Sequence, residues 1–137
     1  MKSIFILSNF LVLPVWFCMI VLPHWSFTRR MMRTYWPVVL PAVLFVLLFV
    51  PQIFVVVPTL ITQPTLEGMQ QLVSTDIGAT TAWVHLITFD LFIGRWAYLE
   101  SREQQMNVWL MAPILFIILL VGPLGLLIYL ISRNRSA

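Results

Sequence analysis

Four apolar segments of membrane-spanning length occupy most of this sequence and constrain its fold more than any other feature. They cover approximately residues 4–22, 37–57, 79–99 and 108–131. A helix needs about 20 mostly apolar residues to cross the hydrocarbon core of a bilayer. Only 9% of the residues are charged, whereas soluble domains carry about 25%. We therefore predict an all-α integral membrane protein, a four-helix bundle that forms a single membrane domain over residues 1–137.

The polar stretch over residues 59–78 predicts a short interfacial segment between helices two and three. At about 20 residues it is longer than a tight helical hairpin needs. Leu66, Met69, Leu72 and Val73 recur at helical spacing within it. This spacing predicts a short helix that lies at the membrane interface and covers one end of the bundle.

Internal prolines predict irregular geometry in the second and fourth helices. Each one removes a backbone donor and clashes with the carbonyl four residues earlier. Pro51 lies in helix two, and helix four contains Pro113 and the Gly122-Pro123-Leu124-Gly125 break. We expect carbonyl groups freed there to be available to His85 or Arg95.

The few polar residues exclude several classes of function. The net charge of +3 comes from short loops and tails, so we predict membrane lipid and no nucleic acid as a partner. The single cysteine, Cys18, excludes an internal disulfide and a cysteine cluster. The two histidines form no metal motif, and glycine-rich phosphate loops and dinucleotide fingerprints are absent. We expect no metal and no cofactor.

The basic residues differ little between the two ends of a four-helix arrangement. One end would carry Arg29, Arg30, Arg33 and Arg102, and the other Lys2, Arg133 and Arg135. The first hairpin alone favours an orientation with both termini outside, because basic loops stay on the cytoplasmic side.

The N-terminus predicts a retained first helix. The apolar run from Ile4 to Leu22 contains no Ala-x-Ala cleavage pattern, and it is long enough to span a bilayer. No Arg/Ser-rich, acid-poor transit peptide is present. We therefore expect an integral protein of a bacterial plasma (inner) membrane, without plastid targeting.

The third apolar segment contains the ionisable residues that are most informative about function. His85, Asp90 and Arg95 lie within eleven residues of a membrane-length stretch. An ionisable group at mid-bilayer costs at least a few kcal/mol unless it is paired, hydrated or neutralised, so it marks a functional site by default. On a helix Asp90 and Arg95 diverge by about 140°. Asp90 is therefore either protonated or paired with another helix, for which the candidates are Asn9, Gln52, Tyr129 and the basic turn after helix one.

Each of these side chains also has a structural interpretation. Asp90 can be paired with another helix, a neutral His85 can bond a carbonyl of a neighbouring helix, and Arg95 can extend to the lipid headgroups. Gly94, one turn beyond Asp90, leaves a notch for a neighbouring backbone or a flat apolar ligand. Trp83 and Trp96 can line an aromatic cavity, and we interpret the polar residues that follow as a solvated face, namely Glu100, Arg102 and Glu103.

The sequence around these residues resembles a known family. The core is Phe89-Asp90-Leu-Phe-Ile-Gly94-Arg95-Trp96, within the longer run 82–102, and it is similar to the signature of the abscisic-acid-deficient-4-like family. Softer matches flank it: Leu66-Glu67-Gly68-Met69, the Trp25-x-x-Thr28-Arg29-Arg30 turn, and Gly122-Pro123-Leu124-Gly125. The resemblance covers nearly the whole chain, although Glu100 stands where an aspartate is commoner.

The resemblance implies an activity on carotenoids, because plant members of the family are required to make neoxanthin from violaxanthin. That conversion rearranges a 5,6-epoxide end group into an allenic alcohol, and it needs an acid and a base but no redox cofactor. We therefore expect a cofactor-independent isomerase or tautomerase of a carotenoid-like isoprenoid. The expected catalytic residues are Asp90, His85 and Arg95. The expected substrate-binding residues are Trp83, Gly94, Trp96, Tyr98 and Glu67.

Two other functions remain open. The chain can be a non-catalytic carotenoid- or lipid-binding subunit that supports a partner enzyme or forms a homo-oligomer, or it can be a small proton-coupled carrier. An acid and a base that converge on one apolar cavity favour the isomerase. A fully bonded Asp90 without a cavity favours the subunit, and a water-lined file of polar groups favours the carrier.

Overall fold

The computed structural model describes residues 1–136, and the side chains of residues 1–133. Every regular element in this part of the chain is a helix. The elements are α1 (Lys2–Val21), α2 (Ser26–Arg33), α3 (Trp36–Phe49), the 3₁₀ turn η1 (Val50–Gln52), α4 (Ile53–Thr62), α5 (Leu66–Val73), α6 (Asp76–Glu103), α7 (Val108–Leu120) and α8 (Gly122–Ser136). The all-α prediction is confirmed for the described residues.

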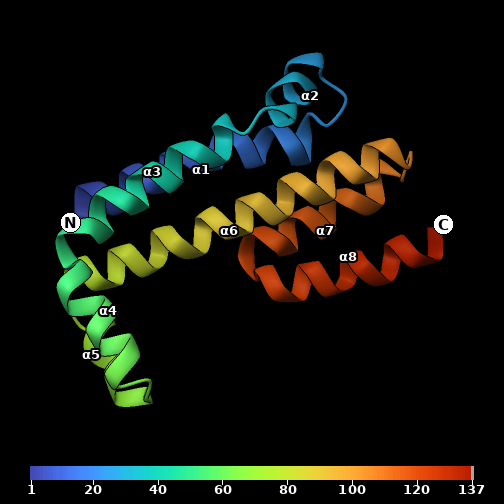
Figure 1. Ribbon diagram of the computed structural model, residues 1–137. Coiled ribbons are helices and arrows are strands. Elements are labelled where there is room, and N and C mark those ends of the chain that lie inside the picture. Colours follow the sequence, from blue (N-terminus) through green and yellow to red (C-terminus); the bar gives the residue numbers. More distant parts are fainter. Residues whose placement is uncertain (137) are drawn as a thin grey trace.

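Helix α6 is the centre of the fold, as its charge content predicted. Helices α1, α3, α5, α7 and α8 all contact it, and in Figure 1 the α1–α3 pair lies on one side of α6 and the α7–α8 pair on the other. The buried core joins α6 to its neighbours through Met19, Leu91, Ala97 and Ile118. Three stretches are long and apolar enough to cross a membrane: 2–21, 36–62 and 76–103.

The fourth predicted helix, over residues 108–131, is wrong as a single span. The chain breaks at Val121 (φ −138°, ψ 84°), and α8 folds back along α7 (Figure 1). With 13 and 15 residues, the two helices are about 20 and 22 Å long, shorter than the hydrocarbon core of about 30 Å. The described chain therefore has a helical hairpin where the predicted bundle has its fourth member.

Local sequence explains this hairpin. Pro123 lacks a backbone N–H and cannot continue a helix from α7, so the predicted break at Gly122-Pro123 is confirmed. Gly125 permits the close return, because a Cβ there would overlap the backbone of Ile118. At Pro113 the prediction is wrong, since α7 continues through that residue.

The second predicted helix is interrupted at Pro51, as expected. The chain forms the η1 turn there, and α4 then departs from the direction of α3 to pack against α5 (Figure 1). The predicted short helix over 66–73 is confirmed as α5. Its first turn is capped by Thr65, whose Oγ1 accepts from Gly68 N at 3.2 Å. Together α4 and α5 form a protruding arm, which we call the α4–α5 hairpin.

The return of α8 changes the charge distribution between the two ends. Arg133 lies beside Glu100 near the C-terminal end of α6, whereas α1 begins near the N-terminal end of α6 (Figure 1). The start of α1 and the last described side chains of α8 thus lie at opposite ends of α6, which differs from the four-span arrangement on which the expectation of both termini outside rested. The arginine-rich end contains Arg29, Arg30, Arg33, Arg102 and Arg133, with Lys2 at the other end, while the side chain of Arg135 lies outside the described part. Most of the basic residues of the described part therefore gather at one end of the molecule.

Candidate functional site on the central helix

The three predicted catalytic side chains lie on the same helix but contact different neighbours. Asp90 lies five positions after His85 in the sequence, and Arg95 lies five positions after Asp90. Each interval advances about 7.5 Å and turns about 140°. In the structure His85 is flanked by α3, Asp90 contacts the start of α8, and Arg95 binds the end of α2. They form no single acid–base cluster.

Asp90 lies against the hairpin break that follows α7. It is half-buried, and its carboxylate occupies the space that a Cβ on Gly122 would need. Gly122 begins α8, and the positive end of a helix dipole favours a carboxylate there. Within residues 1–133 no hydrogen bond or ion pair reaches the Asp90 carboxylate. Asp90 thus faces another helix, as predicted, but it packs closely against Gly122 and does not pair with a polar side chain.

The predicted partners of Asp90 bind other groups. Asn9 Oδ1 accepts from Trp83 Nε1 at 3.0 Å, which ties α1 to α6. Gln52 Nε2 donates to Thr81 Oγ1 at 2.9 Å, which ties η1 to α6. Both contacts fix helices to the central helix and leave Asp90 out.

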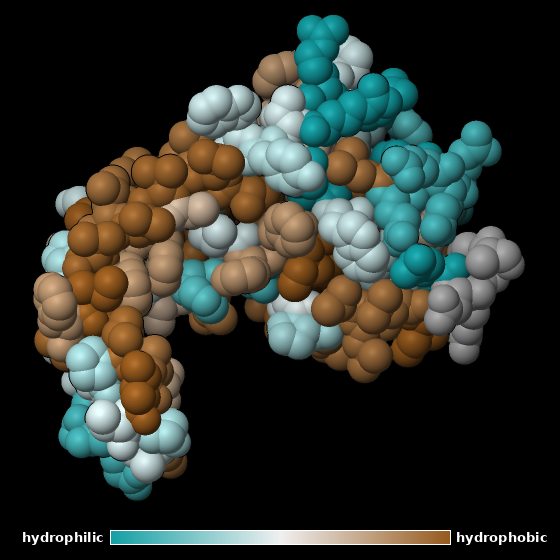
Figure 2. All heavy atoms as spheres, in the orientation of Figure 1, coloured by the Kyte–Doolittle hydropathy of each residue, from teal (hydrophilic) through white to brown (hydrophobic). Residues whose placement is uncertain are grey.

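His85 opens onto an apolar groove between α3, the α4–α5 hairpin and α6. Its imidazole lies between the rings of Phe45 and Phe89, with centroid separations of 5.5 and 4.9 Å. The groove has a volume of about 410 Å³, and His85 is the one titratable side chain among the residues that line it. Its apolar walls include Phe45, Phe49, Leu60, Met69, Leu72 and Leu86. Figure 2 shows the hollow between the hairpin and the body of the molecule.

Arg95 holds the end of α2. The side chain is 8% exposed, its Nε donates to Thr34 O at 3.1 Å, and its Nη2 donates to Arg33 O at 3.3 Å. The guanidinium also lies 4.2 Å from the Tyr35 ring centroid. These carbonyls belong to a helix C-terminus, where cations are favourable, rather than to a proline break as predicted. Arg95 is a structural tie in this arrangement.

Three of the residues predicted to bind substrate contact α1 or the turn that follows it. The Trp83 ring packs 5.2 Å from that of Phe5. The notch at Gly94 is filled by the Trp16 indole, which a Cβ at Gly94 would overlap. The Tyr98 hydroxyl is buried and donates to Pro23 O at 2.6 Å. Protein side chains therefore fill the Gly94 notch and bond the polar atoms of Trp83 and Tyr98.

A polar cluster that the sequence did not reveal joins α6 to α8. Glu100 accepts from the Tyr129 hydroxyl and forms an ion pair with Arg133 at 3.2 Å. The Trp96 ring packs edge-on against Tyr129 at 5.3 Å. The interpretation of Glu100 as part of a solvated face is wrong. Its side chain is only 18% exposed, and it takes part in both a hydrogen bond and an ion pair. Only the return of α8 brings these residues together, so no local sequence signal could have found them.

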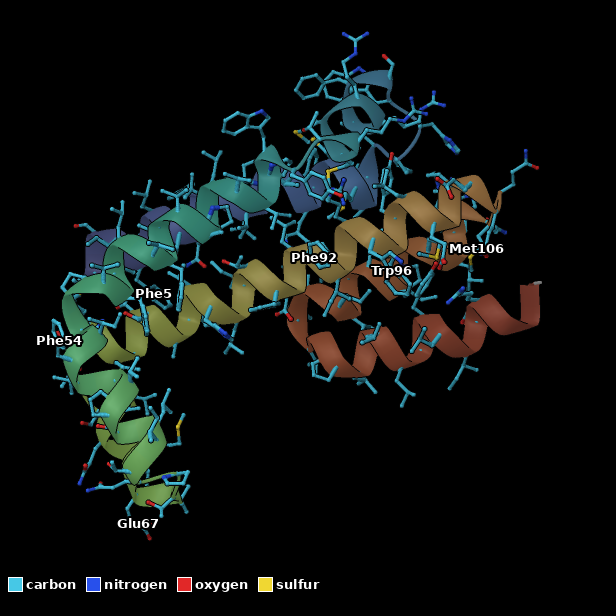
Figure 3. All side chains as sticks on the ribbon, in the orientation of Figure 1. Phe5, Phe54, Glu67, Phe92, Trp96 and Met106 are labelled. Carbon is cyan, nitrogen blue, oxygen red and sulfur yellow. The ribbon has the colours of Figure 1, made fainter. Side chains whose placement is uncertain are left out.

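Glu67 lies far from the rest of the expected site. It is exposed in the first turn of α5, and Figure 3 shows it at the outer tip of the α4–α5 hairpin, away from Trp96. The groove residues Phe45, Phe49 and Met69 were not predicted as site residues. The interruption at Pro51 was the available signal, because it turns α4 and α5 toward α6.

Comparison with known proteins gives one family and one relative. The model of the family described as ABA DEFICIENT 4-like matches residues 3–129, which confirms the family resemblance. The Arabidopsis thaliana protein named Protein ABA DEFICIENT 4, chloroplastic, is 26% identical over 137 residues, which are 96% of this chain and 61% of the relative. The chain thus spans about three-fifths of that protein. Because the relative is chloroplastic, it gives no support to a bacterial membrane. No solved structure matches.

Proposed function

Because the chain belongs to the ABA DEFICIENT 4-like family, we propose that it binds a carotenoid-like isoprenoid and isomerises its end group without a cofactor. The observation that carries this proposal is the apolar groove beside His85. Ligand sites are typically apolar clefts of about 300–1,000 Å³ with a few polar groups that orient the ligand. A groove of about 410 Å³ with a single imidazole has this character.

The groove walls suit a flat, conjugated, apolar ligand. Phe45 and Phe49 stack at 5.5 Å with an interplanar angle of 16°, and both line the groove. Aromatic rings bind other π systems through offset stacking and large apolar contact areas. The groove is open on one side (Figure 2), so a long polyene can place one end group inside while its remainder lies among the lipid chains.

His85 is the group that can exchange a proton with this end group. In the proposed isomerisation His85 donates a proton to the epoxide oxygen as the C–O bond opens. The Asp90 carboxylate accepts the proton that leaves the adjacent polyene carbon, and the electron pair of that C–H bond forms the new C=C bond of the allene. The atoms balance without an oxidant or reductant. A positioned acid or base contributes about 10²–10⁴-fold to the rate.

Asp90 is the second proton-transfer group of the proposal. Leu86 lines the groove, and Asp90 lies one helical turn further along the same face of α6. A ligand that fills the groove and continues toward α8 therefore passes the Asp90 carboxylate. Arg95 is removed from the proposed catalytic set, because its guanidinium binds the carbonyls of α2.

One observation favours a second function, that of a non-catalytic carotenoid-binding subunit. His85 and Asp90 face different neighbours and share no hydrogen bond. A binding role needs the groove and no such pair. In that case the chain holds the isoprenoid for a partner enzyme.

Pigment analysis of a carotenoid-producing host tests both functions. The host is compared with and without the chain, and then with the variants His85→Gln and Asp90→Asn. Catalysis predicts a new isomer that disappears in both variants while the folded protein persists. The matched control is Glu67→Gln at the exposed hairpin tip, which should leave conversion unchanged. Pigment that copurifies with the wild type and the two variants, with no isomer formed, would instead favour the binding subunit.

A further inference from the structure

A second cavity, of different chemistry, lies at the arginine-rich end of the molecule. It has a volume of about 290 Å³ and lies between α2 and the C-terminal end of α6. Its lining residues are Arg29, Arg33, Tyr98, Leu99, Arg102 and Glu103. The groove described above lies at the other end of α6, so this cavity is independent of the proposed function.

Three positively charged side chains line this cavity, and within residues 1–133 none of them has an ion-pair partner. Arg29, Arg33 and Arg102 line the cavity together with the buried Tyr98. Glu103 is the one carboxylate among the lining residues, so the cavity has an excess of positive charge. Arg29 and Arg33 are exposed and Arg102 is half-buried, so an anion that enters the cavity meets an accessible excess of positive charge.

The cavity is built from positioned side chains. Arg102 Nη2 donates to Met106 O at 2.8 Å, which orients its guanidinium, and Arg29 Nη2 donates to His24 O at 3.2 Å. Arg102, which lines the cavity, has a buried Nε without a hydrogen-bond partner among the described residues, and the Oγ1 of Thr28, the residue before Arg29 on α2, is likewise buried without one. Buried polar atoms are nearly always satisfied in native proteins. The region therefore has hydrogen-bonding capacity that the chain itself does not use.

The position of the cavity indicates what fills it. Trp25 precedes α2 and Trp36 begins α3, and the two side chains are 50% and 68% exposed. Exposed tryptophans at the ends of spanning helices mark the level of the lipid headgroups. Figure 2 shows hydrophilic residues gathered around α2 and the neighbouring end of α6. A headgroup at this level meets the cavity without leaving the membrane.

We propose that this cavity binds the phosphate group of an anionic membrane lipid through Arg29, Arg33 and Arg102. Guanidinium groups match phosphate oxygens in bidentate geometry, and basic pockets at the cytoplasmic end of membrane helices recognise phosphate headgroups. In this proposal the acyl chains of the lipid lie along the outer surface beside α2, where they contact the exposed Phe27.

Native mass spectrometry of the full chain in detergent micelles tests this proposal. Phosphatidic acid, phosphatidylcholine and inorganic phosphate are titrated separately. We expect retention of one phosphatidic acid per chain at concentrations where phosphatidylcholine and inorganic phosphate are not retained. Charge-assisted hydrogen bonds predict that Arg33→Gln weakens this binding by at least about 10-fold.

The matched control is Arg30→Gln, which removes the same charge from the same helix outside the cavity lining. Arg102→Gln provides a second test, and circular dichroism confirms that each variant is folded. Inorganic phosphate that binds as tightly as phosphatidic acid would make the site one for a free anion and overturn the lipid assignment. Equal losses of affinity for phosphatidic acid in Arg30→Gln and Arg33→Gln would overturn the assignment of this cavity as the binding site, because general surface charge would then explain the binding.

Discussion

The contact between Gly94 and Trp16 gives the sharpest test of how α1 packs on the central helix. The Trp16 indole is 1% exposed, and a Cβ at Gly94 would lie 2.8 Å from its Cζ3 and 3.1 Å from its Cζ2. These separations are too short for carbon atoms, and the buried ring has little room to move. Overpacking of this kind costs about 1–3 kcal/mol, so we expect Gly94→Ala to lower the free energy of unfolding by about that amount.

A double-mutant cycle with Trp16→Phe isolates this contact. The smaller ring leaves room for the new methyl group. The double variant should therefore lose less free energy of unfolding than the two single variants lose together. The expected coupling is about 0.5–3 kcal/mol, the range for residues in direct contact. The assay is denaturant unfolding in detergent micelles, followed by circular dichroism. Additive losses would refute the packing of Trp16 into the Gly94 notch and would reopen that notch as a ligand site.

Two further substitutions test neighbouring contacts by the same unfolding assay. Gly122→Ala should destabilise the chain by about 1–3 kcal/mol, because the added Cβ overlaps the Asp90 carboxylate. An equal loss in an Asp90→Ala background would contradict this contact. Arg95→Lys should cost about 1–3 kcal/mol, because lysine cannot bind both carbonyls at the end of α2. Arg30→Lys is the matched control, and equal losses in the two variants would show that Arg95 has no special role.

Local sequence rules predicted the positions of most helices. Apolar runs located α1, α3 and α6, because a helix in lipid must satisfy its backbone groups internally and expose apolar side chains. The cost of burying charge predicted that α6 lies at the centre of the fold. Pro51 and the Gly122-Pro123 step were recognisable as interruptions because proline lacks a backbone donor. These features depend on a few adjacent residues, so the sequence alone reveals them.

The direction of the chain after each interruption was decided by tertiary packing. A proline predicts a break but not an angle, and the same apolar composition serves a continuous span or two short helices. The close approach of Gly125 to Ile118 selects the hairpin. The hairpin brings Arg133 next to Glu100, and the positive charge of Arg133 therefore lies at the arginine-rich end.

The arrangement of the candidate site likewise depended on the tertiary structure. The helical period showed that Asp90 and Arg95 point apart, but it could not say which helices receive them. Arg95 lies 61 residues from Thr34, which accepts its hydrogen bond, and the groove beside His85 exists because the chain turns at Pro51. Periodicity along one helix determines only which side chains share a face. The neighbour that covers each face is selected by shape and packing between segments distant in sequence, and only the folded chain contains that information.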